Sequence, residues 1–443
     1  MPIGVNAALS RRAMLRASAL LGAGAALGGW PLGSRLAFAT DGIEGDWPAV
    51  TALIERYVAT RQVSGMIAAL GWGDKPPGYI ARGLEGFDDR DPDGPRSLFR
   101  AYSMTKPVTG MAAMILIDEG RLGLDQPVAD FIPEFAQLQV AVDPAQGLAA
   151  NPAQRVMTVR HLLTHTSGLG YAVVSKDKVS AELTRLGVNP GLISRRKLPG
   201  IARGAPTPGP DEFLRRAATV PLRSEPGAKW AYSMGLDVLG LLIGRLTGQP
   251  FEAFVQERIF APAGMTDSWF RVPQSALGHL TTNYGLVGKH AFAIDRPGSS
   301  VYEGPIPFAF GGSGLVTSPA DYDRFLTMLV NRGEVGGRRV MSEAAVRMGT
   351  SNLLPDGADL TGTWVAGQHF GAGGLVGTGR DEGMFGWSGA AGTIGYAQLR
   401  QGLRTSLFVQ YMPQEKLPIG KEFPKAVGAD IIAQSNAARG NGA

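Results

Sequence analysis

The 443-residue chain contains no cysteine, which excludes disulfide bonds, thiolate metal sites, a cysteine nucleophile and a lipid anchor on an N-terminal cysteine. Beyond the first 40 residues, no stretch approaches the roughly 18 consecutive apolar residues of a membrane-spanning helix. We therefore expect no stable membrane anchor in the mature protein. The hydrophobic content of 44% is ordinary for a globular protein and excludes wholesale disorder.

The net charge of +5 belongs mostly to the start of the chain. Residues 1–39 contain four arginines and no acidic residue, and the remainder has 39 basic residues against 38 acidic ones. Such a near-balance gives no electrostatic case for a nucleic-acid partner.

The first 39 residues have the order of an export signal. The pair Arg11–Arg12 precedes an apolar run over 17–32, and the small-residue sequence Ala37-Phe38-Ala39 follows. A twin arginine before apolar residues is typical of a twin-arginine signal peptide. An uncleaved anchor is the weaker alternative, because four glycines and Pro31 make the run a poor spanning helix. We predict cleavage near Ala39 and a periplasmic or secreted protein.

The predicted secondary structure changes along the mature chain. A helical pattern over 46–61 precedes strand-like runs at 66–72 and 97–102. The middle is mostly helical, with helices predicted at 106–119, 158–164, 211–220, 234–247 and 251–259, then at 320–331 and 342–348. Strand-like runs near 363–370, 392–399 and 405–411 precede a last helix at 421–433. This order favours one sheet built from both chain ends, with a helical lobe inserted between them.

The sequence Ser103-Met104-Thr105-Lys106 is an S-x-x-K motif at a predicted strand-to-helix junction. Residues three apart share a helix face, so the hydroxyl and the amine can meet. The free N–H groups of a helix N-terminus suit a developing oxyanion, and a lysine in apolar surroundings can act as a base. The simpler interpretation is a helix cap beside an outward-reaching lysine. Two further matches, at 175–178 and 194–197, lie in a polar stretch and indicate solvated loop.

Two later junctions hold further candidates. Tyr232 precedes an apolar helix, where its hydroxyl could relay a proton, although a half-buried aromatic is the simpler interpretation of that motif alone. The sequence Trp387-Ser388-Gly389-Ala390 lies in a glycine-rich segment before a strand. There the backbone can approach a substrate and the next N–H can supply an oxyanion donor; a tight turn is the alternative.

Two further patterns suggest other kinds of site, a zinc site and a nucleophile elbow, and both are weaker. His161 and His165 have a zinc-like spacing, but Leu-Leu-Thr lies between them, without a glutamate base or a third ligand. We expect a structural pair of histidines and no metal. The segment Ala231–Gly235 resembles a nucleophile elbow centred on Ser233, but a polar loop precedes it where an elbow needs a strand.

Together, the order and spacing of these motifs resemble the serine β-lactamase and penicillin-binding-protein superfamily. The stretches 99–106, 120–131, 161–168 and 311–325 also look like that superfamily. The resemblance implies an α/β (α+β) fold of the β-lactamase/transpeptidase type, with an antiparallel sheet flanked by N- and C-terminal helices. The α/β lobe would comprise about 40–105 plus 305–443, and the inserted all-helical lobe about 106–304, within one catalytic domain over 40–443.

Within the superfamily, the chain is most similar to class C β-lactamases and to the related family VIII esterases. Two departures from the class C pattern favour the esterase branch. Met234 stands where the pattern Tyr-x-Asn has its asparagine, and Trp387-Ser388-Gly389 stands where the pattern has Lys-Thr-Gly. An indole in place of the cation removes a charge that helps to hold a carboxylate and suits a neutral ester.

The resemblance thus implies an exported serine hydrolase of the carboxylesterase type that forms an acyl-enzyme on Ser103. Lys106 and Tyr232 would share the general-base role, and which of them takes the proton stays open. The N–H groups of Ser103 and Ala390 would form the oxyanion hole, with Trp387, Ser388 and Gly389 lining the substrate site. The expected partner is a small-molecule ester or acyl compound, with no cofactor; the substrate and the oligomeric state stay open.

The sequence leaves three alternatives open. A β-lactamase or D-Ala-D-Ala carboxypeptidase would need another cation in the pocket. A transesterase or amide hydrolase could use the same scaffold. The third alternative is a ligand-binding module without catalysis. The presence of Ser103, Lys106 and Tyr232 argues against it, because binding alone would not require all three.

Overall fold

A seven-stranded antiparallel sheet forms the centre of the α/β layer, in the order β12-β13-β14-β15-β16-β1-β2. The computed structural model describes residues 42–196, 198, 204–288 and 290–440, so the expected leader at 1–39 lies outside them. The strands are β1 (Gly65–Trp72), β2 (Gly78–Gly83), β12 (His369–Phe370), β13 (Leu375–Val376), β14 (Met384–Ser388), β15 (Ile394–Gln398) and β16 (Leu403–Phe408). Because β1 pairs with β16, the two ends of the chain build one sheet, which confirms the predicted fold class.

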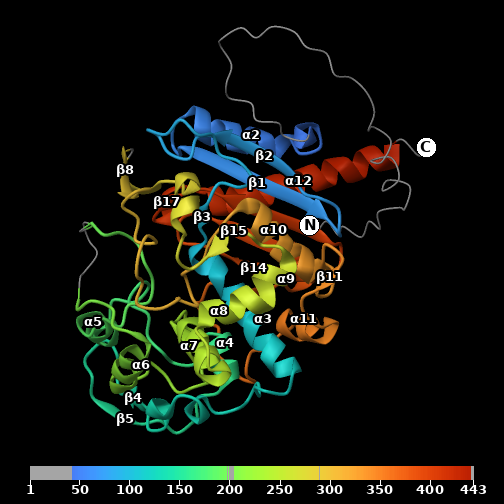
Figure 1. The fold of residues 1–443 in the computed structure, drawn as a ribbon. Coiled ribbons are helices and arrows are strands. Elements are labelled where there is room, and N and C mark those ends of the chain that lie inside the picture. The colour runs from blue at the N-terminus through green and yellow to red at the C-terminus, as the bar shows by residue number, and fades with distance from the viewer. Residues whose placement is uncertain (1–41, 197, 199–203, 289, 441–443) are drawn as a thin grey trace.

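Helices cover both faces of this sheet (Figure 1). On one face lie α2 (Pro48–Ala59) and α12 (Ile419–Gly440), and on the other lies α10 (Pro319–Val330). Successive side chains of a strand point to opposite faces. Accordingly, Met66 packs in the cluster of α2 and α12, while its neighbour Ile67 packs in the cluster that contains Phe325 of α10.

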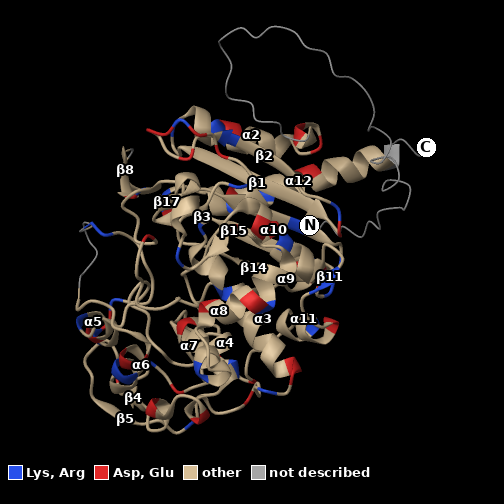
Figure 2. Ribbon diagram, in the orientation of Figure 1, with Lys and Arg blue, Asp and Glu red and all other residues tan. Residues whose placement is uncertain are grey.

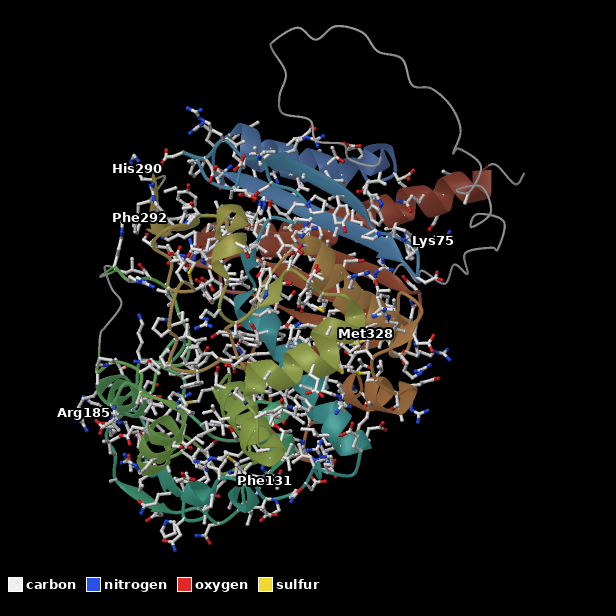
Figure 3. The ribbon with its side chains drawn as sticks, viewed as in Figure 1. Lys75, Phe131, Arg185, His290, Phe292 and Met328 are labelled. Atoms are coloured by element: carbon white, nitrogen blue, oxygen red, sulfur yellow. The ribbon has the colours of Figure 1, made fainter. Side chains whose placement is uncertain are left out.

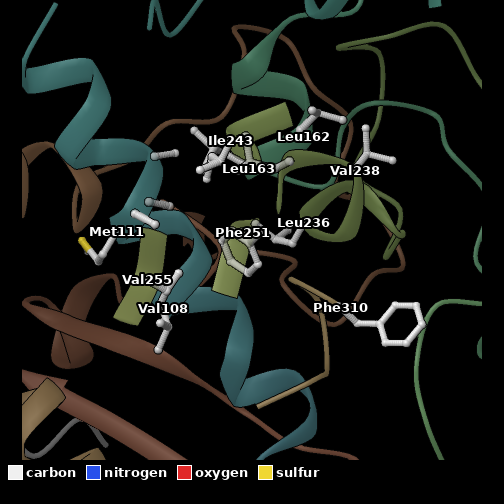
Figure 4. Packing of buried hydrophobic residues seen from close by; sticks show 14 of the residues in the cluster. Val108, Met111, Leu162, Leu163, Leu236, Val238, Ile243, Phe251, Val255 and Phe310 are labelled. Carbon is white, nitrogen blue, oxygen red and sulfur yellow. The ribbon is translucent and has the colours of Figure 1, made fainter. Parts of the chain in front are cut away.

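The helical lobe packs around one buried helix, α3 (Thr105–Asp118), in which every residue from Thr105 to Leu116 is buried. Val108 and Met111 of α3 lie near Leu163, Ile243 and Phe251 (Figure 4). The other helices are α4 (Val159–Leu163), α5 (Lys178–Arg185), α6 (Pro210–Thr219), α7 (Gly235–Thr247), α8 (Phe251–Val255), a π-helical turn (Gln256–Phe260), α9 (Ala261–Ala263) and α11 (Glu343–Gly349). Short 3-10 turns include η2 (Ile43–Gly45), η4 (Val128–Asp130), η5 (Pro133–Phe135), η7 (Gln274–His279), η8 (Gly379–Asp381) and η9 (Gln414–Lys416).

The remaining short strands of the described residues form four small sheets. They are β3 (Phe99–Arg100) with β9 (Val316–Thr317) and β6 (Ser268–Trp269), then β7 (Asn283–Val287) with β8 (His290–Asp295) and β17 (Tyr411–Met412), and the pairs β4 (Gln139–Ala141) with β5 (Ala150–Pro152) and β10 (Glu334–Val335) with β11 (Arg338–Arg339). His290 and Phe292 of β8 lie at the edge of the molecule (Figure 3). Since β17 pairs with β7, this hairpin joins the C-terminal part of the chain.

The strand predicted at 363–370 is wrong over most of its length, because only His369–Phe370 form β12. Gly362 and Gly367 have φ of 71° and 78°, values in the left-handed region that bend the chain, and Trp364 between them is 66% exposed. The strand predicted at 97–102 is likewise confined to β3. Trp387 and Ser388, predicted to lie before a strand, precede β15 and also form the end of β14.

Lys and Arg are interspersed with Asp and Glu along the chain in both lobes (Figure 2). Among the described residues, no helix has the length and apolar character that crossing a membrane requires.

Candidate active site

The turn that carries Ser103 joins β3 to α3. It is the 3-10 turn η3 (Tyr102–Met104), which Tyr102 enters with a φ of 45°, an uncommon value for a non-glycine residue. Residues on both sides of Ser103 are buried, whereas Ser103 itself is only half-buried. The chain therefore presents this hydroxyl at the surface of an otherwise closed turn.

Buried polar contacts hold the Ser103 turn in place. Arg100 is fully buried, and its Nε donates to Asp295 Oδ2 at 2.7 Å, which ties β3 to β8. The hydroxyl of Thr105 donates to the Tyr102 carbonyl at 2.6 Å and accepts from the Leu315 N–H at 3.1 Å. A buried ion pair and satisfied hydroxyl leave the start of α3 little freedom.

Lys106 extends from the first turn of α3 to Ser103, as the motif spacing predicts. Its Nζ donates to Ser103 Oγ at 3.1 Å and to the Gly312 carbonyl at 2.7 Å. The side chain is fully buried, and Nζ lies 4.6 Å from the ring centroid of Tyr232 and 5.6 Å from that of Tyr171. The lysine thus faces aromatic rings rather than water.

Tyr232, 129 residues further along the chain, completes the cluster. Its hydroxyl donates to Ser103 Oγ at 2.7 Å and accepts from Trp387 Nε1 at 3.2 Å. The rings of Tyr232 and Trp387 are stacked, with centroids 5.8 Å apart and planes at 26°. The structure therefore brings together all three residues predicted to be catalytic, and the third motif contacts them through its indole.

Gly389 is the point at which the third motif meets the Ser103 turn. Its N–H donates to the Thr393 carbonyl at 2.7 Å, and a Cβ added to it would lie 2.2 Å from the Ala101 carbonyl oxygen. Only glycine fits here. Within the described part of the chain, the N–H of Ala390 donates to no other group, which leaves it available to an oxyanion. The hydroxyl of Ser388 interacts with that of Tyr396.

The two histidines each accept a backbone hydrogen bond near the site. His161 Nδ1 accepts from the Thr158 N–H at 3.1 Å in a capping box, and burial lowers the pKa of His161 to about 4. His165 Nδ1 accepts from the Ser233 N–H at 3.2 Å, and its ring lies 4.6 Å from that of Tyr232. Burial, and then the charge of Lys106, hold the pKa of His165 well below its usual range. In the ranges that the structure describes, no three His, Asp or Glu side chains form a group that could hold a metal ion.

Sequence reasoning missed three residues of this site. Trp364 is 66% exposed, yet its ring lies 5.3 Å from Tyr232 and 6.1 Å from Trp230, so it stands at the mouth of the site. Tyr171 is buried beside Tyr232, with centroids 5.6 Å apart. Asp237 is fully buried in the first turn of α7. Of the three, only Asp237 stands out in the sequence, as an acid in the apolar first half of α7, but nothing in that pattern indicates its contacts.

A separate groove of about 830 Å³ lies elsewhere on the helical lobe. Its walls come from α7, α8 and the segments 268–271 and 305–309, and they include none of Ser103, Lys106, Tyr232 or Trp387. The chemistry described above is therefore not in this groove.

Comparisons with known proteins agree with the geometry. The family model described as Beta-lactamase matches residues 50–422, and the chain belongs to that family. Esterase EstB of Burkholderia gladioli is 31% identical over 292 residues, which cover 62% of this chain and 68% of the esterase. Protein Rv1367c of Mycobacterium tuberculosis is 37% identical over 261 residues, which cover 59% of this chain and only 60% of that protein.

Among solved structures, EstCE1, described as a hydrolase with promiscuous acyltransferase activity, has the same fold. It superposes with a TM-score of 0.70 over 87% of this chain and 98% of its own, at 21% sequence identity. The predicted membership of the β-lactamase and penicillin-binding-protein group is thus confirmed.

Proposed function

We propose that this chain is an exported serine hydrolase that cleaves neutral esters through an acyl-enzyme on Ser103. One observation carries the proposal: the hydroxyl of Ser103 accepts hydrogen bonds from both Lys106 Nζ and the Tyr232 hydroxyl. A half-buried serine between two groups that can exchange protons is the arrangement that nucleophilic catalysis needs.

In the first half of the reaction, Ser103 Oγ bonds to the ester carbonyl carbon, and its proton passes to Lys106 or Tyr232. The N–H groups of Ser103 and Ala390 stabilise the oxyanion. The ester C–O bond then breaks, and the leaving alkoxide takes a proton from Tyr232, which regains one from Lys106 where Lys106 accepted the serine proton. In the second half, water attacks the acyl carbon and gives a proton to the same base. Ser103 Oγ recovers its proton as the acid departs.

Trp387 supports a neutral rather than an anionic substrate. Its indole is 9% exposed, and its one N–H is committed to Tyr232, so it offers an apolar surface and no charge. Esterase EstB is a relative at 31% identity, in agreement with this choice. The β-lactamase alternative would need a cation at this position or another to hold the carboxylate of the drug.

A second candidate function is transfer of the acyl group to an alcohol. The observation in its favour is the 66% exposed ring of Trp364, which lies 5.3 Å from that of Tyr232 at the mouth of the site and suits an apolar acceptor better than water. Adding aliphatic alcohols to a hydrolysis assay and quantifying the new ester distinguishes transfer from hydrolysis.

The test of the proposed function is a panel of p-nitrophenyl esters of rising chain length, run beside a chromogenic cephalosporin. We expect turnover of the esters, loss of that turnover in Ser103→Ala, and a ratio of kcat/KM that favours a butyrate-like ester over the cephalosporin. A ratio below one would support the β-lactamase alternative instead.

Export is a separate part of the proposal and rests on the leader sequence alone. Replacing Arg11 and Arg12 by lysine should retain the protein in the cytoplasm, whereas the unchanged leader should deliver a mature chain that begins near Thr40. Normal export of the double variant would contradict the twin-arginine assignment.

A further inference from the structure

Asp237 is a buried charged group for which the mechanism above has no use. Its side chain has no solvent exposure, and its Oδ1 accepts from the Gly312 N–H at 2.8 Å. Its Oδ2 has no hydrogen-bond partner in the described part of the chain. A buried carboxylate with an unsatisfied oxygen costs free energy, so its presence beside a reactive site calls for a role.

Gly312 links this carboxylate to Lys106. Its N–H donates to Asp237, and its carbonyl accepts from Lys106 Nζ at 2.7 Å. A Cβ added to Gly312 would lie 2.4 Å from Asp237 Oδ2, so no side chain fits between them. The preceding Gly311 is held in the same way, because its carbonyl accepts from Thr109 Oγ1 of α3 at 2.6 Å. The glycine pair is therefore clamped between α3 and α7.

The result is a continuous line of contacts across the site. It runs from Asp237 through Gly312 to Lys106, then to Ser103 and Tyr232. Met234, at the position where the class C pattern has asparagine, offers no polar side chain. Asp237 lies three residues further on, and residues at that spacing share a helix face.

We propose that Asp237 is a positioning residue: it holds the Gly312 carbonyl against Lys106, and its negative charge sets the pH at which Ser103 becomes reactive. The proposal rests on the proposed function, because it assumes that Lys106 serves Ser103.

The electrostatic part follows from the groups around Lys106. Those facing it are Asp237 of α7, Tyr232 before α7, and Tyr171 and His165 after α4. Burial raises the pKa of Asp237 to about 6, while the charge of Lys106 and the Gly312 N–H act in the opposite direction. Burial also keeps His165 neutral, and it raises the pKa of Tyr171 well above its usual range. Above about pH 6, Asp237 is thus the anion of this group. A buried anion beside an active site disfavours the loss of a proton from the groups around it.

The experiment follows the rate at which a fluorophosphonate probe labels Ser103 between pH 5 and 10, beside kcat/KM for a p-nitrophenyl ester. Asp237→Asn keeps an oxygen for Gly312 but removes the charge, and Asp237→Ala removes both. Asp321→Asn is the matched control, since Asp321 is 4% exposed, accepts from the Asp267 N–H and the Ser268 hydroxyl, and has a pKa that burial raises to about 6.

In Asp237→Asn we expect the midpoint of the alkaline rise in labelling to move down by about one pH unit or more. In Asp237→Ala we expect, in addition, a limiting rate about ten- to a hundredfold lower, because the Gly312 carbonyl loses its anchor. Asp321→Asn should follow the wild-type curve. A profile for Asp237→Asn that superposes on the wild type, or an equal shift in Asp321→Asn, overturns the proposal.

The wild-type protein provides a second reading if either Asp237 variant fails to fold. Its labelling profile should contain a lower inflection near pH 6, where Asp237 takes up a proton, and a single inflection contradicts the proposal. Labelling of Ser103 without ester turnover would contradict the proposed substrate class and leave this inference standing. No labelling of Ser103 at any pH would overturn both.

Discussion

Removing the hydroxyl of Tyr232 separates the chemistry of the site from its packing. Tyr232→Phe deletes one oxygen and retains the ring that contacts His165, Trp364 and Trp387. Two effects follow from the geometry. Loss of the proton relay to Ser103 should lower kcat/KM by about 10²- to 10⁴-fold. The Trp387 N–H, which donates to that oxygen at 3.2 Å, becomes unpaired, at a cost of about 1–3 kcal/mol in the free energy of unfolding.

The assay is kcat/KM for p-nitrophenyl butyrate together with the free energy of unfolding from urea titration. Tyr302→Phe is the matched control, because Tyr302 is fully buried and its hydroxyl has no hydrogen-bond partner among the described residues. We expect the control to retain wild-type activity. Retention of more than about a tenth of the activity in Tyr232→Phe would refute the relay and leave Lys106 as the base for both halves of the reaction.

Three further predictions test other parts of the account. Trp387→Lys should shift the ratio of kcat/KM toward a chromogenic cephalosporin by about ten- to a hundredfold, since a charge-assisted hydrogen bond to a carboxylate contributes about 1.5–3 kcal/mol; an unchanged ratio would show that this position does not select against anions. Trp364→Ala should raise KM about two- to tenfold for esters with aromatic acyl groups while KM for the acetate ester stays constant, because an aromatic contact contributes about 0.5–1.5 kcal/mol. Equal changes in KM for both esters would exclude a role of Trp364 in selectivity. Burial raises the pKa of Glu85 from 4.5 to about 7, so between these pH values the native state keeps a proton that the unfolded chain releases. The melting temperature should therefore fall as pH rises through that window, and Glu85→Gln should flatten the fall. Parallel curves of melting temperature against pH for Glu85→Gln and the wild type would contradict the assignment.

The parts of the fold that depend on local pattern were predictable from sequence. The helix predicted at 211–220 is α6 at Pro210–Thr219, and the one predicted at 234–247 is α7, which ends where Gly248 adopts a φ of 70°. The strand β2 was missed because Gly78–Gly83 lies at the sheet edge and is mostly half-buried, so it lacks an apolar pattern. At 363–370 the apolar residues suggested a strand, but Val365 is buried within a glycine-bounded loop.

In the site too, the local contacts were predictable from sequence and the long-range contacts were not. Ser103 and Lys106 are one helical turn apart, so their contact follows from local geometry. The contacts of Tyr232 with Ser103 and with Trp387 span 129 and 155 residues, and only the resemblance to a family could place them together. Neither route reaches Asp237 and Trp364. Their roles depend on the Gly312 carbonyl and on a surface loop, and these are features of the tertiary structure alone.

The most direct test of the central claim is to identify the residue that a fluorophosphonate probe labels, by peptide mapping of the wild type and of the Ser103→Ala and Ser233→Ala variants. Ser233 is the serine of the alternative elbow, but it is fully buried and its Oγ lies 3.0 Å from His165 Nδ1. We expect the label on Ser103 in the wild type and in Ser233→Ala, and none in Ser103→Ala. A label on Ser233, or one that survives in Ser103→Ala, would contradict the assignment of Ser103 as the nucleophile.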